Sequence, residues 1–185
     1  MHHDVIMAGF GGQGILMIGN LLAVAGLRHG LRVTFFPAYG VEMRGGTANC
    51  TVTLSDREIG SPVTARPLGV VAMNEPSVVK FGPRVRPGGY VVVNSSIVAD
   101  GAFQREDVRV ARVPCNELAL ELGNARVASM VALGAYVELT GLLPLAAVIE
   151  ALPEALPEKA HGLIPLNRKA LELGAAQVSG KGETA

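Results

Sequence analysis

Short apolar runs and longer segments with helical spacing alternate along this chain. Continuous apolar runs are typical of parallel strands covered on both faces, and three occur, at 5–8, 70–73 and 90–93. Two more strands are predicted at 31–36 and 108–113, and Pro37 is expected to end the first because it cannot donate to a ladder. Apolar residues three or four positions apart predict helices over 15–29, 76–81, 116–122, 126–139, 144–152 and 166–176.

Residues 48–55 follow a different pattern, a strict alternation of apolar and polar side chains. This predicts a strand with one polar face, which is either exposed to solvent or covered by a partner protein. Turn residues at 55–58 and the segment 59–62 predict a return strand that forms a hairpin with it. We therefore expect an α/β fold: a mostly parallel sheet flanked by helices, with a Rossmann-like start, one antiparallel hairpin and a helical C-terminal part. Residues 1–176 are expected to form a single domain and 177–185 a flexible tail.

Charge and composition narrow the class of protein. The 185 residues include 16 Lys and Arg against 16 Asp and Glu, so the chain lacks the net basic field of a binder of nucleic acids or anionic membranes. Mean hydropathy is +0.36, which fits a surface that is buried against a partner. No run reaches the roughly 18 apolar residues of a spanning helix, and no secretory leader is recognisable, so a cytoplasmic location is expected.

Cysteines and histidines offer no obvious metal site. Cys50 and Cys115 are 65 positions apart with no CxxC pattern, which favours reduced, packed thiols. His2 and His3 are interpreted as an N-terminal addition, and His29 and His161 as surface or helix-end residues.

A glycine loop follows the first strand, and Gly9, Gly11 and Gly14 satisfy the GxGxxG pattern before a helix. Amides at a helix N-terminus attract anions, and missing Cβ atoms allow a phosphate to approach. A dinucleotide site also needs a carboxylate near the end of the second strand, but no acidic residue lies between Asp4 and Glu42. Three interpretations stay open: tight helix packing, binding of a phosphate or carboxylate, and a stand-alone NAD(P) or FAD site.

Two loops carry the remaining candidate chemistry. In the first, Gly12 precedes Gln13, whose amide can donate and accept hydrogen bonds to a ligand or a partner backbone. The second loop contains a phenol, an anion, a guanidinium and glycines; the candidate binding residues in it are Tyr39, Glu42, Arg44, Gly45 and Gly46. Arg44 would be a bidentate donor, and the alternative is a turn with a local pair between Glu42 and Arg44.

The two loops together resemble the gamma subunit of 2-oxoacid:ferredoxin oxidoreductases, the pyruvate, ketoisovalerate and 2-oxoglutarate oxidoreductase gamma family. The resemblance rests on GFGGQG at 9–14 and YGVEMRGG at 39–46 leading into an alternating strand with Ser55-Asp56. It continues through 71–74, 88–89, the ASMVALGAY segment at 128–136 and 167–174. Val41 and Met43 differ from the common pattern, and Ser129 stands where Asn is frequent.

The resemblance implies a subunit of a heteromeric, CoA-dependent complex of anaerobic metabolism that oxidatively decarboxylates a 2-oxoacid and reduces ferredoxin. Thiamine diphosphate, Mg and iron–sulfur clusters would lie on partner subunits, namely alpha, beta and a possible delta subunit of ferredoxin type. A cluster generally takes four cysteines and this chain has two, so no cofactor, metal or catalytic residue is assigned to it. The overall similarity of the sequence to the family favours 2-oxoglutarate as the substrate over pyruvate or branched-chain acids. The alternatives are a stand-alone nucleotide-binding protein and a purely structural assembly module.

Overall fold

The computed structural model describes residues 1–39 and 46–179, which form one six-stranded sheet with the order β2-β3-β1-β4-β5-β6. The strands are β1 (His2–Phe10), β2 (Arg32–Tyr39), β3 (Thr47–Ser55), β4 (Gly69–Ala72), β5 (Tyr90–Asn94) and β6 (Arg109–Val113). β1, β4, β5 and β6 pair in parallel, whereas β3 pairs antiparallel with both β1 and β2. The expected mixed sheet, with parallel strands in the majority, is confirmed.

The antiparallel partner of β3 differs from the expected one. Residues 59–62 form no strand, and β3 instead pairs along its whole length with β1, from His2 opposite Ser55 to Phe10 opposite Thr47. Gly60 and Pro62 are poor ladder residues, while β1 offers nine residues in register. β3 therefore lies between β1 and β2, and the hairpin is the one formed by β2 and β3.

β2 also runs further than expected, because it continues through Pro37 to Tyr39. Pro37 lies opposite Cys50, and β2 is the edge strand of the sheet. An edge strand has a ladder on one side only, so a residue without an N–H group is tolerated there.

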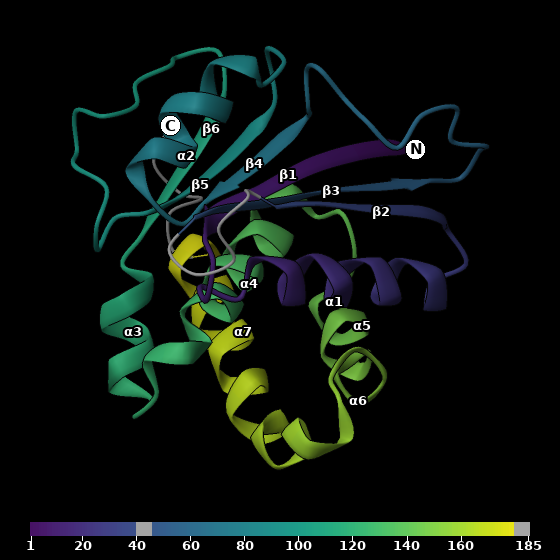
Figure 1. Cartoon of the computed structure of the whole chain (residues 1–185), viewed down its shortest axis with the longest axis vertical. Helices are drawn as coiled ribbons and strands as arrows, with labels where there is room; N and C mark the ends of the chain where they lie inside the picture. Colours follow the sequence, from purple (N-terminus) through teal and green to yellow (C-terminus); the bar gives the residue numbers. More distant parts are fainter. Residues whose placement is uncertain (40–45, 180–185) are drawn as a thin grey trace.

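Helices cover the two faces of the sheet unequally (Figure 1). α1 (Ile15–Arg28) and α4 (Ala128–Thr140) lie against one face, and further helices pack around them: α3 (Cys115–Glu121), α5 (Leu145–Glu150), α6 (Leu152–Ala155) and α7 (Ile164–Ser179). α2 (Glu75–Phe81) lies on the other face. Short 3₁₀ helices η1 (Gly82–Arg84), η2 (Ala125–Val127) and η3 (Glu158–Leu163) complete the connections.

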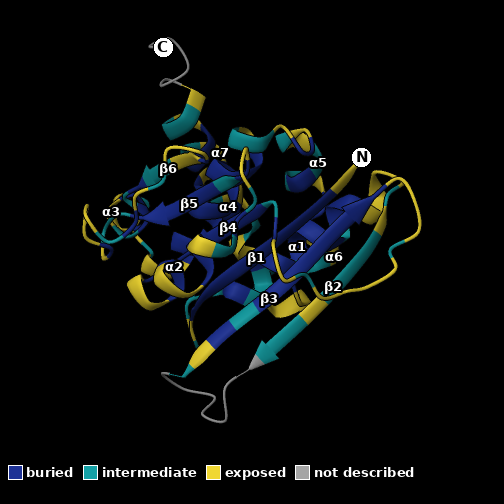
Figure 2. Cartoon of the chain, turned by 90° about the horizontal axis from the view of Figure 1, so that it is seen from above, coloured by how far each residue is buried: buried dark blue, intermediate teal, exposed yellow. Residues whose placement is uncertain are grey.

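The core has two parts, one on each side of the sheet. The larger one joins the inner faces of β1, β3, β4 and β5 to α1 and α4, and the smaller one lies beneath α2. Small residues bring α1 close to the sheet, because a Cβ on Gly19 would fall on the Cys50 sulfur and one on Gly26 on the Leu54 side chain. Figure 2 shows the buried centre of the sheet and the exposed connections at its rim.

The polar face of β3 is more enclosed than its sequence suggests. Thr51 is 8% exposed, Thr53 2% and Ser55 1%, so most of this face is shielded within the chain itself. Asn49 is half-buried and Thr47 is exposed, so only the end of β3 nearest the second loop reaches solvent.

The N-terminal histidines belong to the fold, although no strand was predicted to include them. His2 and His3 are residues of β1, and His3 is 6% exposed. Its Nε2 atom lies 2.6 Å from the hydroxyl of Tyr136 on α4. At the other end, α7 continues through Ser179, whose hydroxyl donates to Glu138, and residues 180–185 lie outside the described part.

No helix within residues 1–39 and 46–179 is long and apolar enough to cross a membrane.

Candidate functional site

The glycine loop turns at the carboxyl end of β1 and leads into α1. Gly12 and Gly14 have φ values of 95° and 76°, which side chains rarely adopt. A Cβ on Gly9 would lie 2.5 Å from the Gln13 carbonyl oxygen Oε1, and one on Gly14 would lie 2.5 Å from the Ser129 hydroxyl. The loop therefore needs its glycines for backbone shape and for close packing.

Gln13 closes this loop through its side-chain amide. Its Oε1 accepts hydrogen bonds from the Phe10 N–H at 2.7 Å and the Asn74 amide at 3.4 Å, and its Nε2 donates to the Met73 carbonyl at 3.4 Å. Both polar atoms are thus engaged within the chain, and the amide ties the loop to the end of β4. Its structural part is to position the loop.

The N-terminus of α1 leaves backbone donors at the same place. Gly14 is the N-cap and supplies no side-chain cap, and the first hydrogen bond of the helix runs from Ile18 N to Gly14 O. The amides before Ile18 in the first turn have no partner within the helix, and the helix dipole places partial positive charge there. This end of α1 is suited to an anion or to a partner's carbonyl groups.

The structure joins the glycine loop to the last residue of the second predicted loop. Gly11 N donates to Gly46 O at 2.9 Å, which joins the glycine loop to the start of β3. Tyr39 ends β2 opposite Ala48. Glu42, Arg44 and Gly45 lie outside the described residues.

Three asparagines form a polar network that the sequence analysis missed. The Asn74 side chain caps α2 by accepting from Ser77 N at 2.9 Å. Asn94 is fully buried; its Oδ1 accepts from Cys115 N at 3.2 Å and its Nδ2 donates to the Asn116 Oδ1 at 3.1 Å. Asn74 and Asn94 directly follow the apolar runs 70–73 and 90–93, and carboxyl ends of parallel strands meet at one edge. That spacing was a signal that could have identified them.

A cleft of about 300 Å³ lies beside the glycine loop at this edge. Its lining comes from the glycine loop, the residue after β4, α3, η2 and the start of α4: Gly12, Gln13, Met73, Asn116, Leu120, Ala125, Arg126 and Ala128. We refer to it as the Arg126 cleft. Ser129, the next residue of α4, is fully buried, and its hydroxyl has no hydrogen-bond partner in the described part of the chain.

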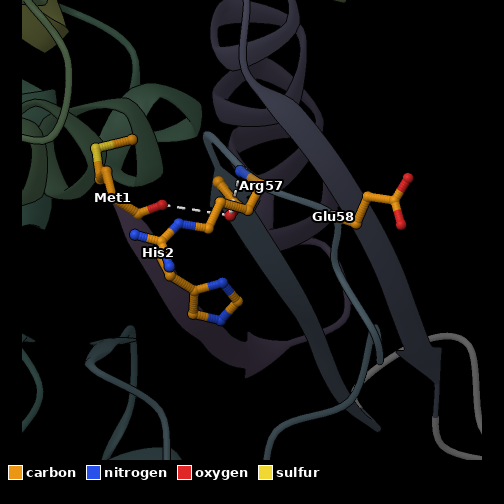
Figure 3. A pocket seen from close by; sticks show the side chains of 5 residues that line it. Met1, His2, Arg57 and Glu58 are labelled. Carbon is orange, nitrogen blue, oxygen red and sulfur yellow. Dashed lines mark hydrogen bonds between the residues drawn. The ribbon is translucent and has the colours of Figure 1, made fainter.

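Another hollow, of about 370 Å³, opens at the opposite edge of the sheet, where β1 begins and β3 ends (Figure 3). Met1, His2, Ser55, Arg57 and Glu58 line it. Arg57 and Glu58 carry opposite charges, so this hollow has no dominant sign of charge. It is separated from the glycine loop by the length of β1.

In the described ranges 1–39 and 46–179, the two cysteines are buried and far from the chemistry of an iron–sulfur ligand set. Burial raises the pKa of the Cys50 and Cys115 thiols to about 12, so neither is a ready thiolate ligand. Within the described residues, no three His, Cys, Asp or Glu side chains gather to hold a metal ion.

The strand order argues against a stand-alone NAD(P)- or FAD-binding site. In the classical arrangement the second strand lies next to the first, so its carboxylate reaches the ribose bound at the glycine loop. Here β3 separates β2 from β1, and the second strand ends in Phe36, Pro37, Ala38 and Tyr39 without a carboxylate.

A mixed sheet with helices on both faces and a glycine loop fastened to the start of β3 defines the class of fold: an α/β domain with a Rossmann-like start. The family model for pyruvate ferredoxin/flavodoxin oxidoreductase matches residues 4–177. The chain belongs to this family, and the expected likeness to its gamma subunits is confirmed.

Individual relatives agree. The ketoisovalerate oxidoreductase subunit VorA of Methanothermobacter thermautotrophicus is 39% identical over 92% of this chain and 35% of its own length. The 2-oxoglutarate synthase subunit KorC of Methanothermobacter marburgensis is 32% identical over 85% of this chain and 88% of its own. This chain thus spans about a third of the VorA relatives but most of KorC.

Solved structures show the same fold. The gamma subunit of a keto/oxoacid ferredoxin oxidoreductase from Geobacter sulfurreducens has a TM-score of 0.81 and 27% identity, covering 96% of this chain and 99% of its own. The 2-oxoglutarate:ferredoxin oxidoreductase of Magnetococcus marinus, solved with 2-oxoglutarate, coenzyme A and succinyl-CoA, has a TM-score of 0.84 and 26% identity, covering 99% of this chain and 32% of its own.

Proposed function

We propose that this chain is the gamma subunit of a cytoplasmic complex that oxidatively decarboxylates a 2-oxoacid with coenzyme A and reduces ferredoxin. In each turnover the acid loses CO₂, its acyl group passes to the CoA thiol with release of a proton, and two electrons reach ferredoxin. The observation that carries the proposal is the hydrogen bond between Gly11 and Gly46, which joins the family's glycine loop to the start of β3.

The cofactors are assigned to the partners. Thiamine diphosphate with Mg and the iron–sulfur clusters would be held by alpha, beta and ferredoxin-type delta subunits. For the clusters the reason is that one cluster generally takes four cysteines, whereas this chain has two and both are buried. Thiamine diphosphate supplies the carbanion chemistry of decarboxylation where it is bound. This chain alone is expected to be inactive. Residues 1–176 would act as one domain, since α7 packs against α4 in the same core.

The glycine loop and the second loop are proposed to contact the phosphates of coenzyme A. Support comes from the free amides at the start of α1 and from the guanidinium of Arg44 in the second loop. If the loops only hold a partner subunit, Arg44→Gln would weaken assembly and leave the KM for coenzyme A of the assembled enzyme unchanged. If they bind coenzyme A, the same substitution raises that KM.

Exposed apolar side chains support an obligate partner. Phe36 is 45% exposed, Val79 57% and Leu120 63%, and they lie on β2, α2 and α3 respectively. Exposed apolar side chains are unfavourable in water. Burial against other subunits would remove them from water.

2-Oxoglutarate is the proposed acid. A branched-chain 2-oxoacid is the second candidate, and the observation that favours it is the 39% identity with the ketoisovalerate subunit VorA, against 32% with KorC.

The test is anaerobic co-purification of the tagged chain from its native host, with mass spectrometry of the partners and measurement of acid-dependent ferredoxin reduction. 2-Oxoglutarate, pyruvate and 2-oxoisovalerate are assayed in parallel with and without coenzyme A. Larger partners and CoA-dependent activity support the proposal, and the preferred acid chooses between the two substrates. Recovery of the chain alone with a bound nucleotide would overturn it in favour of an independent nucleotide-binding protein.

A further inference from the structure

One side of the sheet is covered more thinly than the other (Figure 1). α1 and α4 lie on one face with further helices packed around them, whereas the opposite face carries the short α2, which packs on β1 and β4. Parallel strands in α/β proteins are usually buried on both faces. The side of α2 is therefore the side on which another protein chain would complete the cover of the sheet.

The outward face of α2 combines apolar side chains with a cation. The helix buries Val78 and Phe81 and leaves Pro76, Val79 and Lys80 exposed. Residues three and four positions apart share one face of a helix, so the three exposed side chains lie together. A cation beside apolar side chains is a composition suited to contact with another protein.

Two cations lie over one aromatic ring at the end of this helix. Lys80 Nζ is 5.2 Å and Arg84 Cζ is 5.4 Å from the centroid of the Phe81 ring, which is buried. The negative face of an aromatic ring attracts cations, so the ring helps to hold two like charges close together. Neither cation forms an ion pair with a carboxylate in the described part of the chain.

Arg66 adds a third cation from the connection between β3 and β4. Arg84 donates from Nε to the Ala65 carbonyl at 2.9 Å and from Nη2 to the Thr64 carbonyl at 3.0 Å, which fastens the backbone next to Arg66. Arg66 is exposed, and none of the ion pairs within 1–39 and 46–179 includes it. We refer to the three cations and the exposed valines of this region as the α2 surface: Val63, Arg66, Val79, Lys80 and Arg84.

Charge around the α2 surface has one sign. Residues 59–99 contain four basic side chains and a single acidic one, Glu75. Arg86 is ion-paired with Asp4, and Glu75 begins α2 whereas Lys80 lies in its last turn. The three cations of the α2 surface are thus left without an ion pair in the described residues, although the whole chain has no net charge.

We propose that the α2 surface docks an acidic segment of a partner subunit, with carboxylates of the partner against the three cations and apolar side chains against the two valines. Complementary charge of this kind fixes partner choice and register. The choice of a subunit of the oxidoreductase complex as the partner rests on the proposed function. A nucleic acid fits less well, because three cations are a small footprint on a chain without net positive charge.

Carbodiimide cross-linking tests the contact, because it joins a lysine amine to a carboxylate without a spacer. The complex is purified anaerobically from its native host, and Lys159 and Lys169 serve as exposed reference lysines on η3 and α7. Mass spectrometry is expected to find Lys80 joined to an Asp or Glu of a partner subunit. An acetylating reagent should label Lys80 in the full chain alone and lose that labelling in the complex.

A double charge reversal, Arg66→Glu with Lys80→Glu, puts like charges opposite the carboxylates of the partner. Arg168→Glu with Lys169→Glu is the matched control at exposed positions of α7. Thermal unfolding of the full chains confirms that both variants fold. At low salt the α2-surface variant is expected to release the partner about ten- to a hundredfold faster than wild type, with the control unchanged. The difference should shrink as NaCl screens the charges.

Two results overturn the proposal: equal labelling of Lys80 in the complex and in the full chain alone, and equal release of the partner by the α2-surface variant and wild type. Cross-linking of Lys80 to a second copy of this chain also overturns it, in favour of self-association. An active 2-oxoacid oxidoreductase in which Lys80 stays fully labelled keeps the proposed function and removes the docking surface. A complex in which Lys80 is joined to an acidic partner, but which oxidises no 2-oxoacid, keeps the docking surface and removes the function.

Discussion

The imidazole of His3 and the hydroxyl of Tyr136 are hydrogen-bonded across the interior, at 2.6 Å between Nε2 and the phenol oxygen. The two residues are 133 positions apart and join the first strand to α4. Tyr90 stacks on the same imidazole with 6.2 Å between ring centroids, and Tyr136 also packs against Gly69, where a Cβ would fall on its ring. This contact fastens the amino edge of the sheet, opposite the glycine loop.

Acid is expected to destabilise the protein through His3. Burial lowers the pKa of His3 from 6.5 to about 4, although the nearby Asp4 carboxylate partly opposes this. Below pH 6.5 the unfolded chain takes up a proton that the folded chain does not, so stability falls as the pH is lowered and levels off near pH 4. The full effect is about 3 kcal/mol, and urea unfolding between pH 7.5 and 4 measures it. A His3→Gln variant should lose this part of the slope; curves parallel to wild type would contradict the assignment.

The crossing of α4 and α7 depends on two glycines. A Cβ on Gly134 would meet the Leu171 carbonyl oxygen, and one on Gly174 the Val131 carbonyl oxygen, so backbone faces backbone in both directions. Gly134→Ala and Gly174→Ala are each expected to cost about 2–4 kcal/mol in the free energy of unfolding. Gly162→Ala is the matched control, because nothing lies within 4 Å of that position. Equal midpoints of denaturation for all three variants would show that the helices can separate at low cost.

Several elements were predictable because their signal is local. The runs 5–8, 70–73 and 90–93 are apolar because both faces of these parallel strands are covered, and each became a strand. The apolar spacing over 15–29 predicted a helix, which is α1 over Ile15–Arg28. Local chemistry was sufficient in these cases.

The features that the sequence did not reveal depend on pairing between distant segments. The place of β3 between β1 and β2 is a non-local choice, and alternation at 48–55 carries no information about the partner. Pro37 is compatible with β2 because β2 is an edge strand. His3 can be buried because its imidazole forms a hydrogen bond with the distant Tyr136 hydroxyl. In the candidate site, the two glycine-rich loops were recognised from sequence, whereas Arg126 and Asn116 reach the cleft from elements more than 100 positions after the glycine loop.

Gly14 and Ser129 are expected to be energetically coupled. Gly14→Ala would place a Cβ at a φ of 76° and 2.5 Å from the Ser129 hydroxyl, and should cost about 2–4 kcal/mol. Gly12→Ala has a φ of 95° but no neighbour within 4 Å, so only the backbone cost of about 1 kcal/mol is expected. In a Ser129→Ala background the cost of Gly14→Ala should drop by about 1–2 kcal/mol, as measured by a double-mutant cycle. Additive single effects would mean that backbone conformation alone requires Gly14.

Asn94 is expected to be the most sensitive polar residue of the site. It is fully buried, it satisfies the N–H groups of Cys115 and Ser96, and it donates to Met73 O at 3.4 Å and to Asn116. Asn94→Leu has a similar size but leaves these buried groups unpaired, so it should cost about 3–5 kcal/mol in unfolding free energy.

Asn94→Asp tests whether the hydrogen bonds that the Asn94 side chain donates are needed. The carboxylate can still accept from the two N–H groups, but it cannot donate to Met73 O or Asn116, and its negative charge is buried without a cation. Stability should therefore increase as the pH is lowered and the carboxyl becomes protonated, which is opposite to the His3 effect. Asn116→Asp, at a position on the cleft rim, is the control and should change stability much less. A pH-independent loss in Asn94→Asp would show that shape alone, without the donated hydrogen bonds, explains this asparagine.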